Sequence, residues 1–156
     1  MDSAVSRSVD EAVARFKDVP GGLLPILHAI QDDVGHVPPA AIPTIASALN
    51  LSRAEVHGVV SFYHHFRVRP AGRHVLQMCR AEACQSMGGD ALAAHTRERL
   101  GIDFHETTAD GNLTLEPVYC LGQCACSPAV MVDGVPHGRM TAERLEALLA
   151  SLEEAQ

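Results

Sequence analysis

Four of the five cysteines in this chain fall into two closely spaced pairs. Cys79 and Cys84 form a C-x4-C pattern, Cys120 and Cys124 form a C-x3-C pattern, and 35 residues separate the two pairs. Thiolate sulfur is a strong ligand for soft metals, and four thiolates in two short segments meet the needs of a four-coordinate centre. The spacing therefore indicates a thiophilic metal site, and little else in the chain suggests chemistry.

Several kinds of chemistry fit paired cysteines. Structural zinc sites usually use tighter C-x2-C pairs, although wider ones occur. Disulfides suit small secreted domains, and the N-terminal residues do not read as a secretory signal. A [2Fe-2S] cluster takes two cysteines on each of its irons and tolerates wider pairs, although the plant-type pattern that contains C-x4-C continues with a C-x2-C that is missing here. The spacing favours an iron–sulfur centre and leaves zinc and redox-active thiols open. We expect the fifth cysteine, Cys126, to be a small buried apolar residue and not a ligand.

Strands are predicted just before both cysteine pairs. Residues 74–78 form a short apolar run that leads into Cys79, and residues 113–118 end close to Cys120, whereas loops follow both. Two strand-end loops at one edge of a sheet can converge, and their N–H groups stabilise thiolate and sulfide charge. We therefore expect all four sulfurs to surround one centre.

The rest of the C-terminal half mixes strands and helices. Asp110-Gly111 and Asp133-Gly134 are hairpin signals, and they place further strands at residues 104–108, 129–132 and 135–137. Helices are predicted over residues 90–100 and after Thr141, which is suited to cap the last one. This mixture predicts a small α/β sandwich with one layer of sheet.

The N-terminal half is predicted to be helical and carries no catalytic motif. Ser52 with Glu55 forms a capping box at the start of one of three or four short helices. A break around Pro70 ends this pattern. We expect an N-terminal helical region in residues 1–69 and the cysteine-bearing α/β domain in residues 70–156.

Composition argues against several functions. Hydrophobic residues make up 47% of the chain, yet no apolar run approaches the ~18 residues of a membrane span, so we expect no membrane insertion and a cytoplasmic, bacterial-type location. The net charge of −7 falls within residues 79–156, which disfavours nucleic acid as a partner. No G-x-G-x-x-G follows a strand, so we expect no dinucleotide site in the chain itself, and we predict no catalytic residue.

Residues 107–124, with the sequence TTADGNLTLEPVYCLGQC, resemble the thioredoxin-like [2Fe-2S] subunit of NADH:quinone oxidoreductase and of related NAD-linked enzymes. The resemblance extends through VVSFY at residues 59–63 and PAGRHVLQMC at residues 70–79, and covers roughly residues 20–135. It implies an N-terminal helical bundle followed by a thioredoxin-like [2Fe-2S] ferredoxin domain. The implied ligands of the cluster are Cys79, Cys84, Cys120 and Cys124, whereas Cys126 matches no ligand position.

The resemblance also implies a role. The chain would be a non-catalytic electron-transfer subunit that docks on an FMN- and NAD-binding flavoprotein subunit of a larger multi-subunit oxidoreductase, and we expect residues 20–66 to grip that partner. The segments CACSP (residues 124–128) and DGVPHGR (residues 133–139) resemble the gamma subunit of soluble, NAD-dependent, molybdenum-containing formate dehydrogenases. The equivalent subunits of respiratory NADH:quinone oxidoreductase and of NAD-reducing hydrogenase are the alternatives, with a zinc-stabilised interaction module as the non-redox one.

Overall fold

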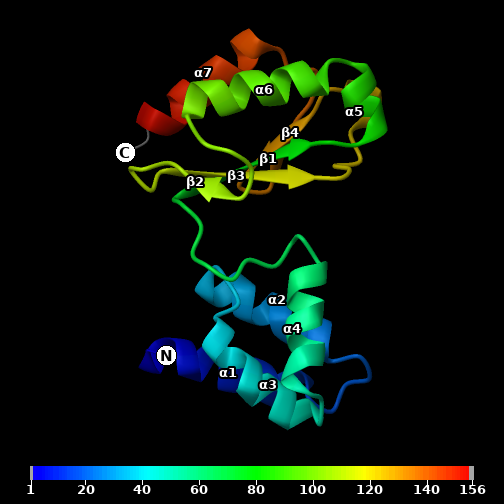
Figure 1. The fold of residues 1–156 in the computed structure, drawn as a ribbon, viewed down its shortest axis with the longest axis vertical. Helices are drawn as coiled ribbons and strands as arrows, with labels where there is room; N and C mark the ends of the chain where they lie inside the picture. Colours follow the sequence, from blue (N-terminus) through cyan, green and yellow to red (C-terminus); the bar gives the residue numbers. More distant parts are fainter. Residues whose placement is uncertain (1, 155–156) are drawn as a thin grey trace. The chain divides into compact units, whose positions relative to one another are not determined.

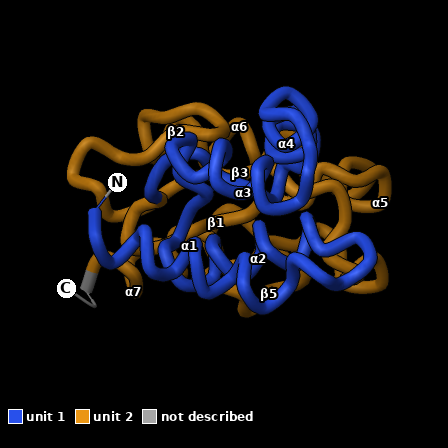
Figure 2. Tube along the Cα trace, turned by 90° about the horizontal axis from the view of Figure 1, so that it is seen from below, with its two compact units in different colours: residues 1–70 blue, residues 71–156 orange. Residues whose placement is uncertain are grey.

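The computed structural model describes residues 2–154. The chain divides into two compact units, residues 1–70 and residues 71–156, which are coloured separately in Figure 2. None of the helices within residues 2–154 has the length and apolar character of a membrane span.

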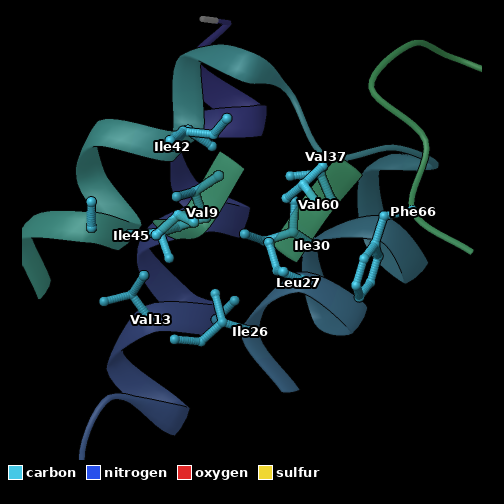
Figure 3. Packing of buried hydrophobic residues seen from close by; sticks show 14 residues of the cluster. Val9, Val13, Ile26, Leu27, Ile30, Val37, Ile42, Ile45, Val60 and Phe66 are labelled. Carbon is cyan, nitrogen blue, oxygen red and sulfur yellow. The ribbon is translucent and has the colours of Figure 1, made fainter. Parts of the chain in front are cut away.

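The first unit is built from helices, as the sequence predicts. These are α1 (Ser3–Phe16), α2 (Leu23–Val34), the 3-10 helix η1 (Pro39–Ala41), α3 (Ile42–Leu49) and α4 (Arg53–Phe62). Their apolar faces meet in one cluster, in which the side chains of Val9, Ile26, Ile30 and Ile45 are fully buried (Figure 3). Removal of this apolar surface from water is the main force that holds the short helices together, since helices of this length are marginal alone.

Side-chain hydrogen bonds fix the start of α4 and the segment that follows its end. The predicted capping box is confirmed, because Ser52 Oγ accepts a hydrogen bond from the Glu55 N–H at 3.1 Å, and Glu55 Oε2 accepts one from the Ser52 N–H at 2.7 Å. Beyond the helix, the buried amide of Gln31 donates to the His65 carbonyl and accepts from the Arg67 N–H, both at 2.7 Å. These bonds tie the segment after α4 to α2.

The second unit contains one mixed sheet. Its elements are β1 (His74–Cys79), α5 (Glu82–Ser86), α6 (Gly89–Leu100), β2 (Glu106–Thr107), β3 (Leu113–Val118), the 3-10 helix η2 (Cys124–Cys126), β4 (Val130–Val132), β5 (Val135–His137) and α7 (Ala142–Glu154). The strand order is β2-β3-β1-β4-β5; β1 and β3 run parallel, and the other neighbouring strands are antiparallel. The expected α/β class and both predicted hairpins are confirmed.

Helices α6 and α7 pack on one face of this sheet (Figure 1). The pleat sends Leu76 and Leu115 to that face, where they join Leu145 and Leu149 of α7 in a buried cluster. Thr141 caps α7, since its Oγ1 accepts a hydrogen bond from the Arg144 N–H at 3.2 Å. The sheet and two helices form a packed base for the segments that leave β1 and β3.

Three local predictions are wrong in detail. The segment between Cys79 and Cys84 is not purely a loop, because α5 begins at Glu82 and carries Cys84. Cys124 lies in η2, where a loop is expected. Strand β2 spans only Glu106–Thr107 of the predicted residues 104–108. The two helices have five and three residues, and such short helices show no complete apolar period in the sequence.

The capping box predicts a measurable contribution to stability. Ser52→Ala removes the acceptor for the Glu55 N–H and should lower the free energy of unfolding by about 1 kcal/mol in urea denaturation. Ser61→Ala is the matched control, because Ser61 lies on the same helix and its hydroxyl only donates to the Gly58 carbonyl. Equal losses for the two variants would contradict the capping role.

Candidate iron–sulfur site

The parallel pairing of β1 and β3 brings the two cysteine-bearing segments together. Cys79, the last residue of β1, lies opposite Val118, the last residue of β3. The pairing continues one residue further, because the Arg80 N–H donates to the Val118 carbonyl at 2.7 Å. On the other side, the Cys79 N–H donates to the Ala129 carbonyl at 3.1 Å. The two segments therefore leave the sheet from neighbouring strand ends, as predicted.

The first cysteine pair is buried. Cys79 ends β1 and Cys84 lies on α5, and both pack with Ala129 in a small apolar cluster. The two thiols lie close enough for each to shift the pKa of the other. Gly89 allows α6 to begin close to this pair, because a Cβ there would lie only 2.6 Å from the Cys84 carbonyl oxygen. Solvent thus has little access to either sulfur.

The second cysteine pair is exposed. The sulfurs of Cys120 and Cys124 lie 3.9 Å apart. A tetrahedral metal that binds thiolates at about 2.3 Å holds two of its sulfurs roughly 3.8 Å apart, so this pair already has the separation that one metal ion requires. Gly122 has φ +72°, a conformation that side-chain-bearing residues rarely adopt, and its N–H donates to Cys120 Sγ at 3.3 Å.

The thiols of the buried pair have opposite pKa shifts. Burial raises the pKa of the Cys79 thiol, although the N–H groups of Ala81 and Leu121 donate to its sulfur and act in the other direction. Burial also acts to raise the pKa of Cys84, but hydrogen bonds that Ser127, Cys79 and the Ala129 N–H can make to the thiolate form outweigh it, and the pKa is lowered. These donors stabilise a thiolate, which is the form that binds metal.

The two pairs lie close enough to interact, because Ser127 Oγ contacts both Cys84 Sγ and the Cys124 carbonyl. The hydrogen bond with Cys120 is the main cause that raises the pKa of Cys124, and the charge of Cys84 contributes to the same shift. Within residues 2–154, no group of three or more histidine, cysteine, aspartate or glutamate side chains is arranged around a single ion position. Two neighbouring pairs, each with N–H donors at sulfur, fit a centre with two irons and two cysteines on each iron.

Cys126 belongs to neither of the two cysteine pairs. It is half-buried, where a buried residue is expected, and its N–H donates to the Gln123 carbonyl at 2.8 Å. A Cβ on Gly138 would lie 2.6 Å from the Cβ of Cys126, so the two backbones approach closely there.

Nothing in the local sequence indicated the contact that Ser127 makes with Cys84, which lies 43 positions away.

Comparison with known proteins agrees with this geometry. The profile of the family described as thioredoxin-like [2Fe-2S] ferredoxin matches residues 9–153. The NADH-quinone oxidoreductase E 2 subunit of Rhizobium meliloti (strain 1021) is 37% identical over 148 residues, which cover 95% of this chain and 88% of that protein. The NADH-quinone oxidoreductase E subunit of Escherichia coli (strain K12) is 32% identical over 149 residues, 96% of this chain and 90% of that protein.

A solved structure shows the same likeness. In the crystal structure of NAD+-reducing [NiFe]-hydrogenase in the air-oxidized state, a chain that is 27% identical superposes with a TM-score of 0.71 over 90% of this chain. The present chain corresponds to only 24% of that hydrogenase chain.

The fold and the paired thiols define an iron–sulfur electron-transfer protein. The chain belongs to the thioredoxin-like [2Fe-2S] ferredoxin family. The expected cofactor, one [2Fe-2S] cluster, and the thioredoxin-like domain are thereby confirmed. The four ligands remain a prediction from spacing and from the pairing described above.

A comparison of Cys124 with Cys126 offers a direct test of the ligand assignment. Cys124→Ser should abolish or cripple cluster binding, because it breaks the exposed pair, whereas Cys126→Ser should leave the iron content and the visible spectrum unchanged. Iron and sulfide analysis of the two purified variants measures the difference. Equal losses in both would mean that the fourth ligand is assigned wrongly.

Proposed function

We propose that this chain is the electron-transfer subunit of an NAD-linked oxidoreductase, with Cys79 and Cys84 on one iron of its cluster and Cys120 and Cys124 on the other. The observation that carries the proposal is the presence of two sulfur pairs at adjacent ends of the parallel strands β1 and β3. When bound, a [2Fe-2S] cluster accepts and gives up one electron at a time.

One side of the proposed cluster site is buried and the other is exposed. The buried side chains of Cys79 and Cys84 keep water from one half, and N–H groups of Ala81, Leu121 and Ala129 stabilise the thiolate charge there. The exposed pair Cys120 and Cys124 forms the side that another protein can approach. The site is thus suited to relay electrons across a surface and not to bind a substrate.

The proposed partner follows from the names of the relatives and from exposed aromatic residues in the first unit. The relatives are named as components of NADH-quinone oxidoreductase, and the similar structure is a hydrogenase that reduces NAD+. We therefore propose that the chain works in the cytoplasm and docks through residues 20–66 on an FMN- and NAD-binding flavoprotein subunit. Phe62 is 73% exposed at the end of α4 and stacks edge-on against Tyr63, which is also exposed. Exposed aromatic residues are enriched at protein interfaces.

Within this class, we favour NAD-dependent, molybdenum-containing formate dehydrogenase. The support is the resemblance of residues 124–128 and 133–139 to its gamma subunit, together with the proximity of these segments. The Arg139 N–H donates to the Cys126 carbonyl at 2.5 Å, and Arg144 donates to the carbonyls of Gly138 and Arg139 at 3.0 and 2.7 Å. The bond between Arg139 and Cys126 thus joins the two segments, the first of which begins with Cys124. NADH-quinone oxidoreductase remains the alternative that the names of the relatives favour.

Purification of the native complex distinguishes these enzymes. A tagged copy of the chain, expressed in its own host, should co-purify with a flavoprotein and with molybdenum, and formate should bleach the visible absorbance of the complex. Bleaching by NADH but not by formate, with quinone reductase subunits in place of molybdenum, would contradict the formate dehydrogenase assignment and keep the electron-transfer role.

The docking role of the first unit is tested by one surface substitution. Phe62→Asp should weaken co-purification with the flavoprotein by more than about tenfold, or ~1.4 kcal/mol, because a charge replaces an exposed aromatic contact. The cluster should stay bound. Val19→Asp is the control, since Val19 is 46% exposed in the same unit but lies outside residues 20–66. Unchanged recovery of the partner with Phe62→Asp would refute this surface.

A further inference from the structure

Ser127 lies between the two cysteine pairs. It follows η2 directly, and its side chain reaches the sulfur of Cys84 on α5. The Cys84 thiol donates to Ser127 Oγ at 3.6 Å, and Ser127 Oγ donates to the Cys124 carbonyl at 2.8 Å. One hydroxyl therefore contacts the side chain of a cysteine from the buried pair and the backbone of a cysteine from the exposed pair.

The hydrogen bonds that the Ser127 hydroxyl can make change when Cys84 binds a metal ion. A serine hydroxyl has one proton to donate and two lone pairs to accept with. A thiolate bound to iron has no proton, so Cys84 can no longer donate to Ser127 Oγ. Rotation about the Ser127 Cβ–Oγ bond then allows the single hydroxyl proton to point at the Cys84 sulfur. Because Cys84 is only 2% exposed, water competes little for that position.

We propose that Ser127 is a positioning residue that donates its hydroxyl proton to the Cys84 sulfur in the cluster-bound protein and thereby raises the reduction potential of the cluster. The proposal rests on the proposed function, because it takes Cys84 as a ligand. The physical reason is that reduction adds one negative charge, which the ligand sulfurs share. A donor at sulfur stabilises the reduced state more than the oxidised state.

The hydroxyl can be removed without a change of shape. Ser127 has φ −64° and ψ 151°, an extended conformation that β-branched residues accept readily. Ser127→Thr and Ser127→Val give side chains of nearly equal volume that differ in the hydroxyl. Ser86→Ala is the control, because Ser86 is on α5 two positions after Cys84 and its hydroxyl donates to the Ala83 carbonyl.

The experiment is a redox titration of each full-length variant, followed by EPR of the reduced cluster. Ser127→Val should shift the midpoint potential to more negative values, whereas Ser127→Thr and Ser86→Ala should stay near the parent protein. In deuterated buffer, the parent and Ser127→Thr should show one exchangeable proton coupled to the reduced cluster that Ser127→Val lacks.

The outcomes separate this inference from the proposed function. If the parent protein holds a [2Fe-2S] cluster and loses it with Cys84→Ser, but Thr and Val at position 127 give the same potential and the same proton couplings, the role of Ser127 is refuted alone. Loss of the cluster in Ser127→Val but not in Ser127→Thr supports a need for the hydroxyl. Loss of the cluster in both variants refutes the role of the hydroxyl, because the larger side chain and not the missing hydrogen bond would then be the cause. A parent protein without iron overturns the proposed function itself.

Discussion

The structure depends above all on the parallel pairing of β1 with β3. Parallel strands end at the same edge of a sheet, so the register that places Cys79 opposite Val118 also determines where both cysteine-bearing segments begin. Every later feature of the site follows from this register. A shift of either strand by one residue would turn its core leucine, Leu76 on β1 or Leu115 on β3, away from α6 and α7, so the buried cluster under the helices also fixes the position of the thiols.

Burial divides the site into two unlike halves. Cys79 and Cys84 lie in an apolar cluster with several N–H donors, whereas Cys120 and Cys124 face solvent on a glycine-containing turn. A buried half protects metal–sulfur bonds from water, and an exposed half allows short-range transfer to a partner. This asymmetry explains how one small unit can both retain a cluster and exchange electrons, and Ser127 connects the two halves.

Much of the fold could be predicted from local patterns. The Asp-Gly turns marked both hairpins, Ser52 and Glu55 marked the start of α4, and the cysteine spacing favoured an iron–sulfur site. The missing features are those that local sequence does not encode. Helix α5 has too few residues to show a period, and the contact between Ser127 and Cys84 depends on two segments meeting in space.

The two thiol pairs are proposed to hold two irons. Metal analysis, Mössbauer spectroscopy and EPR of anaerobically prepared protein distinguish this centre from a site for a single ion. We expect two irons and two acid-labile sulfides per chain, a visible absorbance, and an EPR signal that appears after one-electron reduction. A colourless protein with one zinc per chain would rule out the [2Fe-2S] centre, because the four thiols would then form a single-ion site.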